Sequence, residues 1–151
     1  MELHFCDPGL DYSLDIITEF QQSDLSDWWK DSLFHFYPQI DRTEYERLDA
    51  SSRFLYLRQK LQHIYDAAKP DICGKLGFYA SHWMKYKPQI EDGFSDAFQV
   101  DSRGLFNDLT ANITLNPTCP RYLESRSFDI FYLNSERGAL GMSLHLSLIH
   151  I

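Results

Sequence analysis

Three residues near the end of the sequence have the types and spacing that could support chemistry. Gly138, Gly141 and His145 follow one another at intervals of three and four residues, which are close to whole turns of an α-helix, so they share one helix face. Each glycine inside a helix costs about 1 kcal/mol relative to alanine. Two glycines on one face therefore predict that something, such as another backbone, packs closely there. His145 would lie at the edge of that contact, either as a metal ligand or as an ordinary hydrogen-bonded or partly exposed side chain.

The six residues that follow His145 resemble a translated laboratory DNA sequence. Residues Leu146–Ile151 can be encoded by CTG-TCT-CTT-ATA-CAC-ATC, a string that resembles the transposon end used to prepare sequencing libraries. This match predicts that residues 146–151 form a non-native tail. It also predicts that residues 1–145 form a single domain that is incomplete at its C-terminal end.

A strand, a short turn and a helix precede this tail, and together they resemble the zincin-type metallopeptidases, in particular an uncharacterised bacterial group of that class. The residues that carry the resemblance are Phe128–Leu133 and Gly138–His145. In these enzymes a helix carries His-Glu-x-x-His and follows an edge strand that bounds the substrate cleft. The resemblance implies that His145 is the first zinc ligand and Phe128–Leu133 the edge strand. It also implies that the intact parent is a hydrolase that binds zinc and takes a peptide or protein substrate.

The printed chain lacks the rest of this motif. Leu146 stands where the general-base glutamate would be, and Ile149 stands where the second histidine would be. His150 is five residues beyond His145, which places it roughly 140° further round a helix. A catalytic zinc site normally needs three protein ligands. We therefore expect an inactive N-terminal fragment of a zinc-dependent metallopeptidase, with no cofactor bound to the chain as printed.

The elements that would position these residues begin with helices. Apolar residues at helical spacing, with polar caps before them and prolines after them, predict helices over the first two-thirds of the chain. The predicted ranges are Tyr12–Gln22, Trp28–Tyr37, a helix from Ser51 or Ser52 that ends at Pro70, and Asp71–Lys87, which ends at Pro88.

The pattern changes after Gly93. Asp101–Gly104 has turn chemistry, and two stretches rich in β-formers predict strands. The predicted strands are Leu109–Asn116 and Ser127–Leu133, separated by a loop over Thr118–Ser127. Asn134-Ser135-Glu136 then predicts the start of the final helix, with a cap and a first-turn acid. The fold class is α+β, with helices first, a small sheet after them, and an active-site-type helix at the end.

Other candidate side chains are less specific. His35, His63 and His82 share no metal-ligand spacing, and each is most simply structural. Four acidic residues near Gly93 indicate either a solvated turn or a site for a cation or a basic peptide; they are Glu91, Asp92, Asp96 and Asp101.

The adjacent tryptophans Trp28 and Trp29 cannot both face one side of a helix. We expect one of them to pack in the core and the other to lie at a groove or an interface. This aromatic surface supports a second hypothesis, in which the chain is a non-catalytic helical domain that binds another protein.

Composition excludes several functions. The net charge of −8 argues against nucleic acid and against anionic membrane surfaces, which bind basic proteins. The sequence shows no apolar run near the length of a membrane span and no signal peptide. Three widely spaced cysteines, Cys6, Cys73 and Cys119, predict buried free thiols in a reducing cytoplasm. The oligomeric state is left open.

Overall fold

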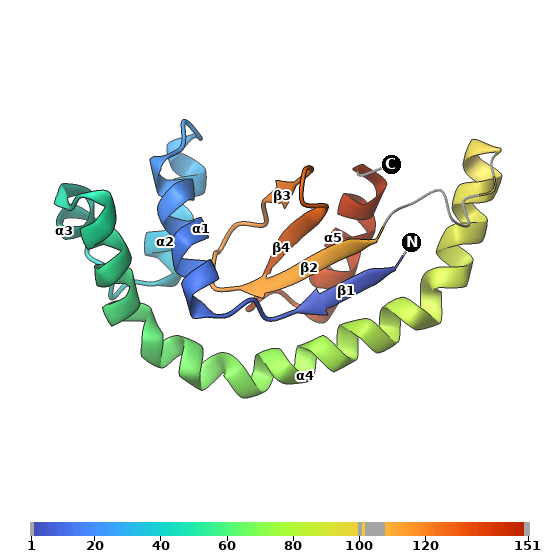
Figure 1. Ribbon diagram of the computed structural model, residues 1–151, viewed down its shortest axis with the longest axis horizontal. Coiled ribbons are helices and arrows are strands. Elements are labelled where there is room, and N and C mark those ends of the chain that lie inside the picture. The colour runs from blue at the N-terminus through green and yellow to red at the C-terminus, as the bar shows by residue number, and fades with distance from the viewer. Residues whose placement is uncertain (1, 100, 102–107, 150–151) are drawn as a thin grey trace.

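A four-stranded mixed sheet is flanked by helices in the computed structural model, which describes residues 2–99, 101 and 108–149 (Figure 1). The α+β class and the helix near the C-terminus are confirmed. In chain order the elements are β1 (Leu3–Cys6), α1 (Leu10–Gln22), α2 (Asp27–Phe36), α3 (Arg42–Arg47), α4 (Ala50–Phe98), β2 (Leu109–Thr114), β3 (Arg121–Tyr122), β4 (Ser127–Phe131) and α5 (Glu136–Ile149).

The sheet begins at the N-terminus, where no strand was predicted. Its strand order is β1-β2-β4-β3; β1, β2 and β4 are parallel, and β3 is antiparallel to β4. Cys6, Asn112 and Asp129 lie in register across the three parallel strands. Because side chains alternate between faces along a strand, these three polar residues share one face, and their apolar neighbours share the other.

The apolar face is covered by α4 and α5. Phe5 of β1 contacts Tyr79 of α4, with ring centroids 5.6 Å apart. Helix α5 packs against both α4 and β4, so both helices meet this side of the sheet. On this face the buried apolar residues of β2 and β4 are Leu109, Ala111, Ile113, Phe128 and Ile130.

Helix α4 passes through both prolines that were predicted to end helices, so those two predictions are wrong. Pro70 and Pro88 lie inside this 49-residue helix, and both are exposed. Each proline removes one backbone hydrogen bond and bends the helix away from its ring. Figure 1 shows α4 curved beneath the sheet. The bend is tolerated because buried residues on the inner side, such as Ile72 and Trp83, hold the helix against the sheet.

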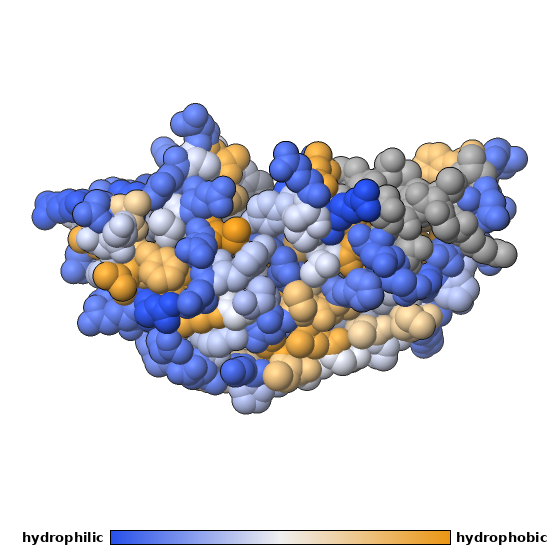
Figure 2. Space-filling model, viewed as in Figure 1, coloured by the Kyte–Doolittle hydropathy of each residue, from blue (hydrophilic) through white to orange (hydrophobic). Residues whose placement is uncertain are grey.

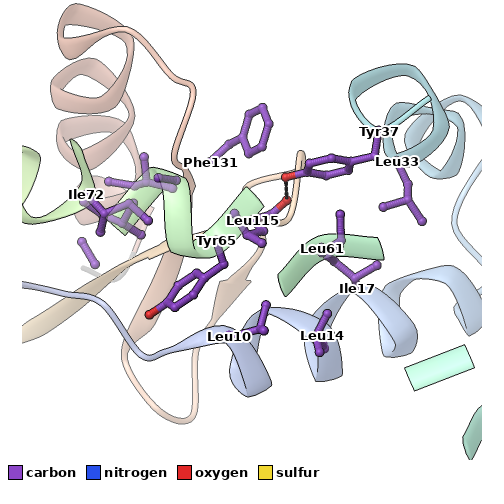
Figure 3. Packing of buried hydrophobic residues seen from close by; sticks show 14 of the residues in the cluster. Leu10, Leu14, Ile17, Leu33, Tyr37, Leu61, Tyr65, Ile72, Leu115 and Phe131 are labelled. Carbon is purple, nitrogen blue, oxygen red and sulfur yellow. Dashed lines mark hydrogen bonds between the residues drawn. The ribbon is translucent and has the colours of Figure 1, made fainter. Parts of the chain in front are cut away.

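The first helices pack at the end of the sheet where the parallel strands finish. Leu10, Leu14 and Ile17 of α1 lie against Leu61 of α4 (Figure 3). The hydroxyl of Tyr37, just after α2, donates to the carbonyl of Leu115 over 2.6 Å. The predicted helices Tyr12–Gln22 and Trp28–Tyr37 are thus present as α1 and α2, with ends shifted by one or two residues.

Two surface predictions fail. Trp28 and Trp29 are both exposed, at 71% and 45%, and they pack edge-to-face on each other instead of reaching the core. Glu91, Asp92 and Asp96 lie within α4 and not in a turn, because the helix continues past Pro88. Most of the predicted turn Asp101–Gly104 lies within residues 102–107, which are outside the described residues.

The surface of the molecule is mixed in character. Figure 2 shows hydrophilic and hydrophobic side chains interspersed on one face, with apolar patches over the helices at one end and along α4. None of the described helices is both long enough and apolar enough to span a lipid bilayer.

Candidate functional site

Helix α5 begins where the sequence predicted, because its cap is local. The Ser135 hydroxyl accepts a hydrogen bond from the Gly138 backbone N–H at 3.1 Å. The backbone N–H of Asn134 donates to the carbonyl of Phe131 at 2.9 Å, which turns the chain at the end of β4. Lys75 of α4 donates to the carbonyl of Tyr132. The turn between β4 and α5 is therefore held by a backbone hydrogen bond within it and by the Lys75 side chain of α4.

The exposed side of α5 carries the three residues that the spacing placed together. Gly138, Gly141 and His145 are exposed, whereas Ala139 and Ser143 are buried against the rest of the protein. The predicted close contact at these glycines is wrong for the part of the chain that the structure describes. There, a β-carbon added at Gly141 would meet no heavy atom within 4 Å outside its own stretch of helix, and one added at Gly138 would meet only the Ser135 hydroxyl at 3.1 Å.

The edge strand is also not the one that was predicted. Ser127–Phe131, the observed β4, is paired on both sides, with β2 and with β3. The edge strand beside β4 is β3, Arg121–Tyr122, which lies in the stretch predicted to be a loop, and β1 forms the opposite edge. A two-residue strand has too little pattern to be seen in a sequence, and its pairing with β4 reveals it only in the fold.

The residues present do not form a zinc site. Among the described residues, no group of three or more histidine, cysteine, aspartate or glutamate side chains is placed to hold a metal ion. His35 lies in α2, and His63 and His82 lie on α4; none of them belongs to such a group among the described residues. Helix α5 continues through residue 149, but the side chains of residues 146–149 and the whole of His150 lie outside the described residues.

A cluster of polar side chains, which was not predicted from the sequence, lies on the face of the sheet opposite α4 and α5. Asp129 is fully buried in the middle of β4. Its carboxylate accepts hydrogen bonds from Tyr12 at 3.0 Å, from the Asn112 amide at 3.0 Å and from Tyr122 at 3.4 Å. The Cys6 thiol donates to the Asn112 side-chain oxygen at 3.0 Å. Side chains of α1, β2 and β3 therefore meet at the Asp129 carboxylate of β4, and Cys6 of β1 joins the cluster through Asn112.

Burial sets the electrostatics of this cluster. It raises the pKa of Asp129 from 3.8 to about 6, although the hydrogen bonds from Asn112, Tyr12 and Tyr122 oppose the rise. Burial also raises the pKa of the Cys6 thiol, with further contributions from Asp7 and Asp129. A raised thiol pKa leaves little thiolate at neutral pH, and the thiolate is the nucleophile. The cluster therefore links the strands of the sheet to α1, and it does not make the Cys6 thiol a better nucleophile.

One signal could have revealed this cluster. Aspartate and asparagine are depleted in strands, yet Asp129 and Asn112 stand inside the two stretches predicted as strands. A buried polar residue must find a partner, so each of them required another polar group on the same face. The partner Tyr12 lies more than one hundred residues away in the sequence, and only the fold brings it there.

Comparison of the chain with protein-family models, with curated proteins and with solved structures gives no match in any of the three.

Proposed function

We propose that this chain is the N-terminal part of a zinc-dependent metallopeptidase and that His145 is its first zinc ligand. The observation that carries the proposal is the arrangement around α5. This helix follows β4 directly, packs against β4 and α4, and presents His145 on its exposed side. The neighbour of β4 is a short antiparallel edge strand, β3.

The arrangement supports the proposal in two ways. Residue 149 lies one turn beyond His145 in the same helix, so a histidine there would share its face with His145, as two ligands of one zinc ion must. The outer edge of β3 has no partner strand among the described residues. Such an edge can bind an extended peptide through backbone hydrogen bonds. Zinc would supply an activated water molecule when bound; this chain would supply one imidazole and the peptide-binding edge.

The experiment begins with the natural gene. Genomic DNA is read beyond the codon for His145, and the full natural chain is expressed and titrated with zinc. We expect Glu-x-x-His to be encoded, one zinc ion to bind per chain, and peptide cleavage to depend on it. His145→Ala should abolish zinc binding, whereas His63→Ala, which removes an exposed histidine of α4, should not. A full chain that stays metal-free at micromolar zinc contradicts the proposal.

A second function is favoured by one observation. Trp28, Trp29 and Phe36 are exposed and line a groove of about 520 Å³ beside Pro117 and Thr118. Exposed aromatic side chains of this kind are typical of protein interfaces. A natural sequence without Glu-x-x-His after His145 would make a protein-binding domain the better account. In that case Trp28→Ala with Trp29→Ala should abolish binding of the partner.

We also infer a reducing compartment such as the cytoplasm, because the three cysteines are free. Cys73 is exposed, and Cys6 and Cys119 are half-buried, so the expectation of buried thiols holds only in part. Alkylation followed by mass spectrometry of protein from its natural source should find three free thiols. A disulfide in that protein contradicts the inference.

A further inference from the structure

A pocket on the polar face of the sheet lies between α1 and the strands β2, β3 and β4. Its volume is about 460 Å³, which is within the usual range for small-molecule sites. Ile16 is the only apolar residue among the described residues that line it, and most of the others carry a hydroxyl group. The hydroxyl-bearing residues are Tyr12, Thr110, Tyr122, Ser125 and Ser127. The walls of this pocket therefore suit a polar ligand.

The charges at this pocket are negative. Glu19, whose side chain is exposed, lines it, and no lysine or arginine is found among its described lining residues. Asp129 is adjacent to the pocket, because its three hydrogen-bond partners also line it. These partners are Tyr12, Asn112 and Tyr122. A ligand in the pocket would thus lie close to two carboxylates.

The Asp129 carboxylate has no positive partner in the described part of the chain. It is fully buried, and its hydrogen-bond donors are neutral hydroxyl and amide groups. Burial raises its pKa to about 6, the hydrogen bonds oppose the rise, and no cationic side chain contributes, so the carboxylate is mostly ionised at neutral pH. Buried charges in proteins are normally paired.

A cation in the pocket could act as this partner without touching the carboxylate. The hydroxyl oxygen of Tyr12 is 3.0 Å from Asp129, so a charge seated against the lining residues would lie within about 8 Å of it. Two unit charges at that separation still interact strongly at the effective dielectric constant of a protein. The buried carboxylate would therefore favour a cationic ligand over a neutral one of the same shape.

The hydrogen bonds already present indicate the other groups of the ligand. The Tyr12 hydroxyl donates to Asp129, and the Asn112 amide donates to Tyr12 and to Asp129, so these donors are used within the protein. The Glu19 carboxylate can only accept, and serine and threonine hydroxyls can accept as well as donate. A ligand that presents several donors matches this set of groups.

We propose that this pocket binds a small organic ammonium compound that also carries hydroxyl groups. Its ammonium group would lie beside Glu19, and its hydroxyl groups would lie against Thr110, Ser125 and Ser127. The proposal is independent of the metallopeptidase proposal, because it uses neither His145 nor zinc.

Glucosamine and glucose provide a matched pair of probes. The two sugars differ by an ammonium group in place of one hydroxyl, so calorimetric titration at neutral pH isolates the contribution of the charge. We expect glucosamine to bind saturably and glucose to bind at least about tenfold more weakly. Cyclohexylamine keeps the ammonium group and a six-membered ring but lacks the hydroxyl groups, and it should also bind at least about tenfold more weakly.

A pair of variants on α1 tests the location. Glu19→Gln keeps the size of the side chain, removes its charge, and should weaken glucosamine binding about tenfold. Asp15→Asn removes one carboxylate from an exposed position one turn earlier in the same helix, outside the residues that line the pocket, and should change the affinity little.

The carboxyl ¹³C signal of Asp129 provides a second readout. Saturating glucosamine should lower the pKa of Asp129 by about one unit, because a nearby positive charge favours the ionised form. Glucose, which is neutral, should leave that pKa where it is. This measurement separates binding in the pocket from binding elsewhere on an acidic surface.

A preference for glucosamine over both control compounds, reduced in Glu19→Gln and kept in Asp15→Asn, supports the proposal. Equal binding of glucosamine and either control compound overturns it, as does the absence of saturable binding. Equal losses in the two variants, or an Asp129 pKa that glucosamine does not change, overturn the assignment to this pocket.

Discussion

Phe128 and Asp129 are neighbours in β4, and both are fully buried, yet they belong to two different interiors. Phe128 lies on the face of the sheet that α4 and α5 cover, among apolar side chains. Asp129 lies on the opposite face, where Tyr12, Asn112 and Tyr122 surround its carboxylate. The same strand thus builds a hydrophobic core on one side and a hydrogen-bonded network on the other.

The two faces of the sheet are stabilised in different ways. The apolar face gains from the removal of hydrocarbon from water, which is not directional. The polar face gains little from burial and depends on every hydrogen bond being made, because an unmatched buried group costs the full desolvation penalty. We therefore expect the two faces to respond differently to truncation, to pH and to the loss of a single hydroxyl.

The largest effect should come from the apolar face. Phe128→Ala removes a fully buried ring and should lower the free energy of unfolding by about 4 kcal/mol. Urea denaturation at neutral pH measures it. Leu55→Ala, which truncates an exposed side chain of α4, is the control and should change little. A loss for Phe128→Ala no larger than that of the control would mean that the apolar face is not a packed core.

The next effect should come from pH. The folded-state pKa of Asp129 is raised from 3.8 to about 6. Its stabilising contribution is therefore complete at low pH and is lost as pH rises through that window. Asp129→Asn cannot titrate. The free energy of unfolding of the wild type relative to Asp129→Asn should fall by roughly 3 kcal/mol across the window. A difference that stays constant with pH would show that Asp129 is not shifted.

A smaller effect should follow from the loss of one hydroxyl. Tyr12→Phe removes a donor to the Asp129 carboxylate and should cost about 2 kcal/mol at neutral pH. Because that hydrogen bond lowers the pKa of Asp129, the pH window should also move upward. Tyr86→Phe, at an exposed tyrosine of α4, is the matched control. Equal losses for the two variants would contradict the importance of the polar network.

The smallest effect concerns the outer side of α5, which belongs to neither interior. Gly141→Ala should raise the free energy of unfolding by about 1 kcal/mol, since alanine is the better helix former and no described residue outside the same stretch of helix lies within 4 Å of the added methyl group. Gly9→Ala should have the opposite sign, because Gly9 has a φ of 93°, which strains any residue with a side chain. A destabilised Gly141→Ala would restore the original expectation of a close contact at that position.

Much of the fold could be predicted because its signals are local. The cap at Ser135, the β-formers of Leu109–Thr114 and Ser127–Phe131, and the helical spacing in α1 each depend on residues a few positions apart. The site was predicted only in part. The shared side of Gly138, Gly141 and His145 follows from the helix period, whereas the zinc chemistry of His145 remains a prediction.

The sequence by itself therefore determined the α+β fold class, the positions of most helices and strands, and the net negative charge. Only the tertiary structure decided the rest, and the physical reason is distance along the chain. Strand β1 pairs with β2 across about one hundred residues, and Tyr12 reaches Asp129 in the same way. Pro70 and Pro88 have strong local preferences to end helices, but burial of the inner side of α4 against the sheet outweighs them. Long-range burial and pairing, which no local pattern encodes, thus formed the polar network around Asp129.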